Sequence, residues 1–489
     1  MRLRYSIVVL CLFISSIFHA QIEDSTKIHV SFDSKYWASV KGSTVTFIEL
    51  KPYNRYEELK ISSFDKQLNQ SIIIDEVLDK KYKFKQQWSN DSSFFILLSQ
   101  TNAKKHLLIE YFHSTKKHRK TFFETFMKVE AEKFRKFGDY AYIASTVKQN
   151  PILVQVNLVS NKIKVLPYPM LGNAKIEEMK VHEEPQQMDI IISSLLKRET
   201  HIHLKSYALN GELVQEKKYK NDPDDEREFI STNITRIGVK DFYITGTYSK
   251  DGRELNGLYT IKCEDDKDKI TYTPISSFKN YYNFLPQRER EKKEEDIIKK
   301  TEKGKDVTIQ EKLLLHDVIT LDSTYYILAE AYYPTFRQES FVTYLYGRPM
   351  IQYRTVFNGW EKSHFLSAKF SMKGKLMSDT SIVIHTSKST NLVKDIYVSE
   401  KEDKKEYSLF YSKSDKIYEA DLNLKNKENF TPIDLPHMSF GGIRKWYDNT
   451  FIGLFTKIER PPISLVIITN KKYVVLCKFK SEDNDRYPK

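Results

Sequence analysis

The sequence is poor in cysteine, with only Cys11, Cys263 and Cys477 among 489 residues. A small disulfide-stapled fold and a structural zinc site both need more cysteines than this. A chain of this length can bury a sufficient core without covalent bridges. Cys263 and Cys477 both lie in strand-like apolar runs, so we predict that they are buried thiols that are not bonded to each other.

Motifs of cofactor and active sites are also missing, since no glycine-rich phosphate loop, nucleophile elbow or His-Glu-x-x-His sequence occurs. The sequence therefore predicts no cofactor and indicates no catalytic residue. Asp222, Asp224 and Glu226 alternate in a turn that could bind calcium, but a solvated acidic turn is the simpler interpretation. His201 and His203 share one face of a strand, and two ligands do not make a metal site.

Long apolar segments are absent, apart from a short run near the N-terminus. A basic start (Met1-Arg-Leu-Arg4), an apolar run from Ser6 to Phe18 and then His19-Ala20-Gln21 are typical of a secretory signal peptide. We expect residues 1–20 to be removed and 21–489 to form one exported domain. The run is too short for a transmembrane anchor, and no later segment predicts one.

Positive charge is in excess, with 78 Lys and Arg against 65 Asp and Glu, a formal net charge of +13. The basic residues are scattered through turns and form no tract interleaved with aromatics. We therefore read the excess as a solvated surface and expect no nucleic-acid partner.

A strand-like pattern recurs along the chain and is clearest in Thr324–Pro334, which is rich in aromatic and β-branched residues and follows a polar turn. Each copy centres on one apolar anchor residue. The anchors are Ala38, Ile96, Ile143, Ile192, Ile244, Ile327, Leu409 and Ile452.

The anchor spacing points to a specific all-β architecture. Most spacings lie near the ~40–50 residues of a four-stranded propeller blade. The spacings on either side of Ile327 are longer and indicate two insertions, 276–312 and 335–362. We predict a β-propeller of eight four-stranded blades, or seven if two copies merge.

The two insertions differ in composition. Gln287 to Lys303 is almost entirely charged and favours a solvated helix or arm, with Glu and Asp spaced to pair with Lys across a turn. The second insertion is rich in Tyr, Phe, Arg and Trp and lies between the second and third strands of its unit. Alternation of strand direction predicts that both insertions emerge on one face of the propeller.

Glu330 stands out because most other copies carry a small hydroxyl residue three positions after the anchor. A carboxylate among strands needs a partner, and the nearest candidates along the chain are Arg348, Arg354 and His364. Two readings stay open: a ligand-binding carboxylate, or a structural ion pair that fixes the second insertion.

A candidate binding surface follows from these residues. Aromatic and arginine side chains dominate contact energy at recognition sites. The hypothesis is a canopy over one sector of the ring, and the alternative is that the second insertion folds back as extra core. The candidate ligand-binding residues are Glu330, Tyr332, Tyr333, Arg348, Arg354, Trp360 and His364.

Glu330-Ala-Tyr-Tyr-Pro334, with Arg354–Gly359 and His364 downstream, resembles uncharacterised exported β-propeller-like proteins of Gram-negative bacteria. The resemblance covers about 50 residues. It implies export, to the periplasm or cell surface, and β architecture, but no activity.

The function that the sequence favours is a non-catalytic binding or scaffold protein for a protein or glycan. The alternative is a polysaccharide-active hydrolase or lyase on the same fold. A hydrolase needs two carboxyl groups roughly 5–10 Å apart in one cleft, which a structure can test.

Overall fold

The computed structural model describes residues 22–480 with gaps at turns, and its description of side chains ends at Leu424. The gaps of four or more residues are 31–34, 167–173, 385–391, 402–405, 431–437, 446–449 and 460–470. The signal-peptide prediction and Asp222 and Asp224 lie outside the described residues.

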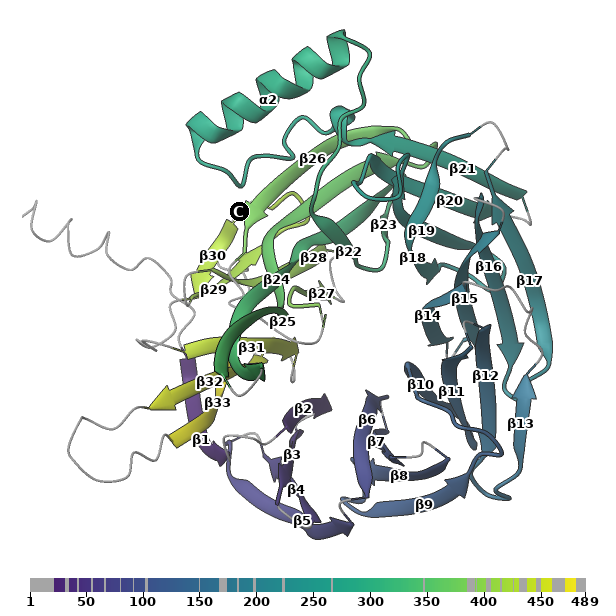
Figure 1. Ribbon diagram of the computed structural model, residues 1–489, viewed down its shortest axis with the longest axis vertical. Helices are drawn as coiled ribbons and strands as arrows, with labels where there is room; N and C mark the ends of the chain where they lie inside the picture. The colour runs from purple at the N-terminus through teal and green to yellow at the C-terminus, as the bar shows by residue number, and fades with distance from the viewer. Residues whose placement is uncertain are drawn as a thin grey trace, which may run out of the picture.

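The described strands form antiparallel sheets that follow one another around a ring (Figure 1). The fold is therefore all-β and a β-propeller, as the repeat predicts. The first three sheets along the chain are β2 (Lys35–Lys41), β3 (Thr44–Pro52), β4 (Tyr56–Phe64) and β5 (Gln70–Asp79); β6 (Tyr82–Ser89), β7 (Ser93–Gln100), β8 (Lys105–Phe112) and β9 (His118–Glu124); and β10 (Lys133–Phe137), β11 (Tyr140–Val147), β12 (Asn150–Asn157) and β13 (Ile163–Leu166).

The next three sheets carry the polar clusters described below. They are β14 (Ala174–His182), β15 (Gln187–Leu196), β16 (Glu199–Ala208) and β17 (Leu213–Lys220); β18 (Glu228–Arg236), β19 (Phe242–Ser249), β20 (Gly257–Glu264) and β21 (Lys267–Pro274); and β22 (Lys312–Leu315), β24 (Thr324–Leu345), β25 (Arg348–Ser371) and β26 (Leu376–Val383), with β23 (Ile319–Leu321) also paired to β24.

Two further sheets complete the eight that the described residues form. One contains β27 (Tyr397–Lys401), β28 (Glu406–Lys413), β29 (Lys416–Ala420) and β30 (Asn426–Phe430). The other joins β31 (Met438–Lys445), β32 (Thr450–Glu459) and β33 (Lys471–Lys480) to β1 (Ile22–Val30). Because β1 pairs with β33, the first and last described strands close the ring together.

The anchors of the repeat lie in the second strand of their sheets, with one exception. Ile96, Ile143 and Ile192 are buried between sheets, where apolar faces pack together. Ala38 was assigned wrongly, because it lies in β2, the first strand of its sheet. The equivalent residue in β3 is the fully buried Ile48, which lies 48 residues before Ile96 and makes the spacing regular.

The charged insertion forms a short 3₁₀ turn, η1 (Ile275–Ser277), and the helix α2 (Gln287–Glu302). The helix buries no residue, and ion pairs join Glu295 to Lys299 and Asp296 to Lys300. It lies beyond β26 at the rim of the ring (Figure 1). No described helix is long and apolar enough to cross a bilayer.

The two cysteines that are predicted to be unbonded lie in different sheets. Cys263 in β20 is a buried free cysteine, and its Sγ lies 3.0 Å from the ammonium of Lys217. Cys477 lies in β33 of another sheet, beyond the described side chains.

Candidate binding surface

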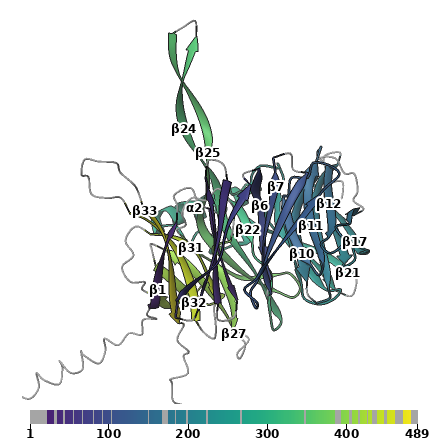
Figure 2. The ribbon, with the colours of Figure 1, turned by 90° about the horizontal axis from the view of Figure 1, so that it is seen from below.

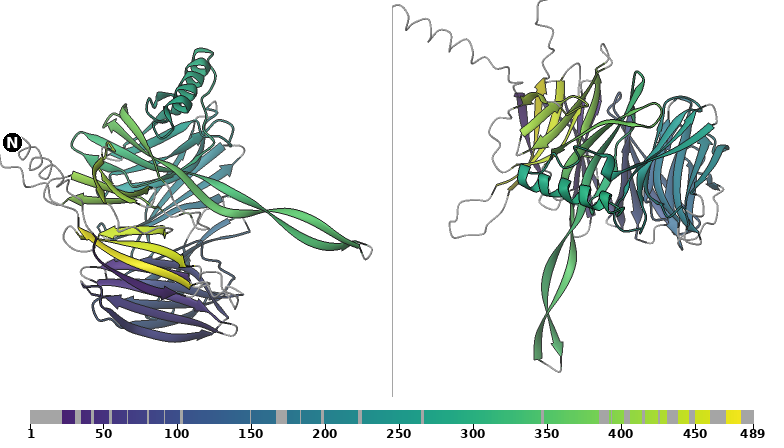
Figure 3. Two further views of the ribbon diagram at one scale, coloured as in Figure 1. Left: turned by 90° about the vertical axis from the view of Figure 1, so that its left-hand side faces the viewer. Right: turned by 90° about the horizontal axis from the view of Figure 1, so that it is seen from above.

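The aromatic insertion is neither a canopy nor a folded-back core. β24 and β25 continue past the sheet and form a two-stranded ribbon that projects from one face of the propeller (Figures 2 and 3). The helix α2 lies at the rim instead, so the two insertions do not cover the ring together (Figure 3). Both connections nevertheless reach the same end of the sheet, because Lys312, which ends the charged insertion, pairs with Tyr332.

The strands extend because this segment is dense in β-branched and aromatic residues, which fit a pleated surface. A register shift marks the start of the ribbon, between Thr335 and Phe336. Gly359 at this shift has φ +106°, which a residue with a Cβ rarely adopts, and its carbonyl accepts a hydrogen bond from Thr335 Oγ1 at 2.8 Å.

The ribbon has two chemically different faces. Directly opposed residues of an antiparallel pair lie on the same face, and faces alternate along each strand. The register therefore places eight residues on one side, which we call the apolar face: Phe336, Gln338, Ser340, Val342, Ile351, Tyr353, Thr355 and Phe357. The polar face carries Arg337, Glu339, Phe341, Thr343, Met350, Gln352, Arg354 and Val356.

The large side chains of the apolar face are open to solvent. Tyr353 is 69 % exposed, Ile351 63 %, Phe336 59 %, Val342 56 % and Phe357 44 %. None of the eight residues on this face is charged. Such a concentration of large exposed apolar side chains on one uncharged face is more typical of an interaction site than of a solvated surface.

The polar face is organised by charge. Glu339 accepts from Arg337 at 2.7 Å and from Arg354 at 2.9 Å, and the Arg354 guanidinium lies 5.7 Å from the ring centre of Phe341. Arg348 is exposed at the far end of β25. The two arginines predicted as partners of Glu330 therefore lie out on the ribbon, and that prediction was wrong.

Glu330 is instead enclosed at the base of the ribbon, with no exposed side-chain surface. Its carboxylate accepts from His316 Nε2 at 2.7 Å and from Lys362 Nζ at 2.5 Å. The backbone N–H groups of Asp395 and Ile396 donate to it at 3.0 Å. The cluster thus joins β24 and β25 to the residue that follows β22 and to the segment that precedes β27.

The contacts around Glu330 stabilise its ionised form. Burial opposes ionisation, but the hydrogen bond from His316 and the positive charge of Lys362 outweigh it and lower the pKa of Glu330 to about 2. Four donors of the protein surround the carboxylate: His316 Nε2, Lys362 Nζ and the backbone N–H groups of Asp395 and Ile396. This geometry matches a structural ion pair that fixes the base of the ribbon.

His364 is also buried, but its described contacts are with Phe284, Tyr281 and Ser363 rather than with Glu330. Its ring stacks on Phe284 with centroids 3.8 Å apart and meets Tyr281 edge-on at 5.1 Å. Nδ1 lies 2.9 Å from Ser363 Oγ. Burial lowers the pKa of His364 to about 3, so the ring is neutral near pH 7. Its contacts with Phe284 and Tyr281 hold the charged insertion against the sheet.

The remaining aromatic candidates form a short row at the base of the ribbon. Tyr332 and Trp360 meet edge-on at 5.4 Å, Trp360 meets Phe357 at 5.1 Å, and Phe357 meets Phe336 at 6.2 Å. Tyr333 is 37 % exposed beside them. Trp360 therefore connects the base of the ribbon to its apolar face.

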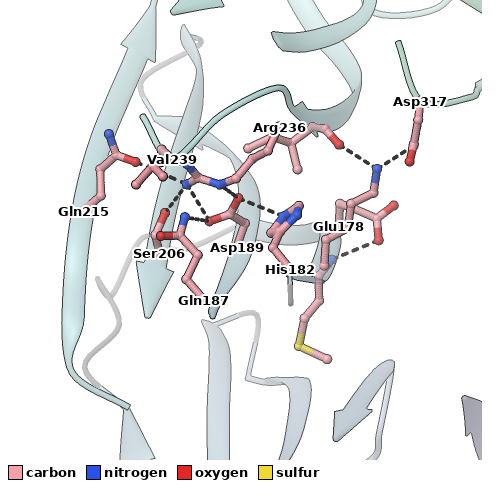
Figure 4. A network of polar contacts seen from close by, with 12 residues as sticks. Glu178, His182, Gln187, Asp189, Ser206, Gln215, Arg236, Val239 and Asp317 are labelled. Atoms are coloured by element: carbon pink, nitrogen blue, oxygen red, sulfur yellow. Dashed lines mark hydrogen bonds and ion pairs between the residues drawn. The ribbon is translucent and has the colours of Figure 1, made fainter. Parts of the chain in front are cut away.

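A second buried ion pair, outside the predicted site, lies across two neighbouring sheets (Figure 4). Arg236 of β18 donates to Asp189 of β15 through Nε at 2.6 Å and through Nη2 at 2.9 Å, and Ser206 and His182 also contact this pair. Burial raises the pKa of Asp189, but contacts with His182 and Arg236 lower it to about 2.

Polar contacts also link the inner strands of three sheets. Lys180 of β14 donates to the backbone carbonyl of Ile234 at 2.6 Å and to Asp317 at 2.5 Å, as Figure 4 shows in part. Asn233 donates to the carbonyl of His316 at 2.9 Å. These contacts hold neighbouring sheets in register around His316, which itself contacts Glu330.

The metal candidates gain no support from the described residues. Glu226 is exposed, and its neighbour Asp225 binds Arg227 in a bidentate ion pair. His201 and His203 are buried with stacked rings, and His203 contacts Ser194 at 3.2 Å. Among the described residues, no group of three or more His, Cys, Asp or Glu side chains could hold a metal ion.

Sequence reasoning missed His316, Lys362 and Asp395 as the partners of Glu330. The register offers the only signal, because Leu314 opposes Glu330 and Tyr332 opposes Lys362 across neighbouring strands. His316 directly follows the short apolar strand β22, so its position could have been inferred once β22 and β24 were paired. Asp395 lies in another unit and carries no local signal.

Comparison with known proteins gives structural likenesses only. No family model matches the sequence, and no curated protein matches it. The polysaccharide lyase Uly1 is 7 % identical, with a TM-score of 0.42 over 81 % of this chain and 89 % of that one. The Dos1 propeller is 10 % identical, with a TM-score of 0.45 over 94 % and 96 % of the two chains.

The β-propeller domain of the Trilobed protease from Pyrococcus furiosus is 9 % identical, with a TM-score of 0.32 over 72 % of this chain and 99 % of that domain. These similarities concern the fold. A shared fold does not by itself determine a function.

Proposed function

We propose that this chain is an exported, non-catalytic binding or scaffold protein that contacts a partner protein through the apolar face of the ribbon. The observation that carries the proposal is the exposure of Phe336, Val342, Ile351, Tyr353 and Phe357 on one uncharged side of a projecting ribbon. Exposed aromatic side chains of this type supply most of the contact energy at protein interfaces.

A protein partner is favoured over a glycan. Sugar hydroxyl groups are held by carboxylates, amides and similar polar side chains, and Gln338 is the only amide on the apolar face. A sheet face that combines large apolar side chains with a few small ones instead offers shape complementarity to another apolar surface.

The alternative, a polysaccharide-active enzyme, is weakened by the geometry around Glu330. An acidic neighbour is present, because the Asp395 carboxylate also binds Lys362, at 2.7 Å. Both carboxylates therefore bind one ammonium group, and Glu330 is fully enclosed. A general acid needs a raised pKa and access to substrate, and the pKa of Glu330 is lowered.

A photo-crosslinking experiment in the source cells tests the proposal. A photoreactive amino acid at Tyr353 or Ile351 should crosslink one defined protein, whereas the same group at Gln352 or Thr343 on the polar face should not. The captured protein is then purified and its binding measured directly. Equal crosslinking from both faces, or none from either, would contradict the proposal.

A matched pair of variants completes the test. Val342→Ser with Ile351→Ser removes apolar surface from the apolar face, and Phe341→Ser with Met350→Ser removes a similar amount from the polar face. We expect only the first pair to weaken binding, by at least tenfold, because an apolar interface depends on the buried side chains. Export is tested separately, by N-terminal sequencing of the mature protein.

A further inference from the structure

We propose that the partner of the apolar face is a second copy of this chain, so that two ribbons pack face to face in an antiparallel homodimer. This inference rests on the proposed function, since it names the protein that the face binds. It follows from the symmetry, the area and the edges of the ribbon.

The apolar face is nearly self-complementary about its middle. Phe336 and Phe357 form one apolar layer near the base, and Val342 and Ile351 form another near the tip. The layers are six residues apart along the strand, about 20 Å. The ribbon twists along its length (Figures 2 and 3), so in an antiparallel pair related by a twofold axis the two ribbons wrap around each other, and the base layer of each copy lies against the tip layer of the other.

The middle of the face suits such a twofold axis. Ser340, Thr355 and Gln338 are smaller or polar and surround the large, 69 % exposed ring of Tyr353. In the antiparallel pair, the Tyr353 ring of one copy faces these smaller residues of the other. Large side chains therefore meet small ones, as packed sheet faces require.

The exposed area is sufficient for a modest dimer. From their exposed fractions, the five large side chains offer roughly 450 Å² of apolar surface per copy. Two copies then bury roughly 900 Å², and the polar residues between the layers bring the total near the ~1,200 Å² at the lower end of stable interfaces.

The charge of the apolar face and the unpaired backbone edges of the ribbon favour a second copy of the chain over a lipid surface. The net charge of +13 opposes association of two chains, but this face carries no charge, and Arg337 and Arg354 point to the opposite side. A lipid surface fits less well, because both outer edges of a two-stranded ribbon keep unpaired backbone groups that cannot be buried in hydrocarbon. A second ribbon leaves these edges in water.

Antiparallel packing also separates the two propellers. Each ribbon projects away from its own ring (Figure 2), so opposite ribbon directions put the rings at the two ends of the assembly. The positively charged rings are then far apart. The polar faces, with the Arg337–Glu339–Arg354 ion pairs, remain in solvent on the outside.

Sedimentation of the purified mature chain over a range of micromolar concentrations tests the dimer. We expect the mass to double from that of one chain, and Val342→Ser with Ile351→Ser to abolish the doubling. Phe341→Ser with Met350→Ser, on the polar face, should leave it unchanged. A wild-type chain that stays monomeric, or a dimer that survives the apolar-face substitutions, overturns the inference.

Cysteine crosslinking tests the antiparallel arrangement. Ser340→Cys lies close to the proposed axis and should crosslink to its own counterpart with a short bismaleimide. Val342→Cys lies about 20 Å from its counterpart in the antiparallel pair and should not. Gln352→Cys on the polar face is the control, and the unsubstituted chain measures background. Crosslinking at Val342→Cys, or none at Ser340→Cys, overturns the arrangement.

The outcomes separate this inference from the proposed function. A monomeric chain whose Tyr353 photo-crosslinks a different protein refutes the dimer and supports the function. A monomeric chain that binds vesicles of neutral and anionic phospholipid through the apolar face refutes both.

Discussion

Replacing Glu330 with glutamine tests whether a buried, ionised carboxylate fixes the base of the ribbon. In the structure this carboxylate accepts from His316, Lys362 and two backbone amides and has no exposed surface. Glutamine has nearly the same shape but no charge, and its amide nitrogen is a donor that faces other donors. The buried ammonium of Lys362 loses the negative charge of Glu330 and keeps its contact with Asp395.

The expected loss of stability can be calculated in two ways, from the cost of breaking a buried ion pair and from the pKa of Glu330. Breaking a buried ion pair by removing one partner typically costs about 3–5 kcal/mol. The lowered pKa of Glu330, about 2 against an ordinary value of 4.5, corresponds to about 3 kcal/mol of stabilisation of the ionised form. The two figures agree, so we expect Glu330→Gln to lower the free energy of unfolding by about 3–4 kcal/mol.

The sign of the pH dependence follows from the same shift. Because the folded-state pKa is below the unfolded value, the stabilisation is complete above pH 4.5 and is lost as the pH falls towards 2. The difference between wild type and Glu330→Gln should therefore be constant near neutral pH. It should shrink below pH 4.5.

Equilibrium denaturation and amide hydrogen exchange measure the effect. The amides of Asp395 and Ile396, which donate to Glu330, should exchange at least a hundredfold faster in the variant, because about 1.4 kcal/mol corresponds to a factor of ten. Glu339→Gln is the matched control, since Glu339 also binds two cationic groups but lies on the ribbon with 30 % of its side chain exposed. It should cost less than about 1 kcal/mol. Equal effects of the two substitutions would refute the reasoning.

Three further outcomes are expected. His364→Phe keeps the stack on Phe284 but removes a group whose folded pKa, about 3, lies below its unfolded value of 6.5. Stability is lost through such a group as the pH falls below 6.5, so the variant should gain about 2 kcal/mol on wild type between pH 7 and pH 5 in denaturant titrations. Replacing 337–356 with an Asn-Gly turn should change unfolding free energy by less than about 1 kcal/mol, because the ribbon packs on nothing else in the described chain. Arg236→Met should cost about 3–5 kcal/mol by leaving Asp189 buried without its main partner, and adding Asp189→Asn should recover part of it.

The propeller could be predicted from the sequence because each sheet repeats one strong local signal. Ile96, Ile143 and Ile192 centre apolar second strands that lie in the middle of their sheets, where periodicity and burial agree. The signal failed at the first unit. There, Tyr36-Trp37-Ala38 in β2 resembles the pattern, and the true equivalent around Ile48 follows it after a short turn.

The charged helix was also predictable from local properties. Its ion pairs run between residues four apart, so the local sequence alone indicates a helix. The ribbon could be predicted only in part from the sequence. The composition of 335–362 indicated a distinctive insertion, but its two faces appear only when Phe336 is placed opposite Phe357 and Val342 opposite Ile351.

The partners of Glu330 show why the site resisted prediction. Proximity along the chain indicated the arginines of the insertion as partners, yet those arginines lie on the ribbon, away from Glu330. Sheet pairing instead brings in His316 and Lys362 from neighbouring strands, and the next sheet supplies the two backbone amides. The partners of this carboxylate come from strand β25, from the residue after β22 and from the segment before β27, so the site is a product of topology. The same topology explains how the base of the exposed ribbon is fixed. A ribbon held only by its own two strands would be free to change its angle to the propeller, and the buried charge cluster around Glu330 fixes that angle.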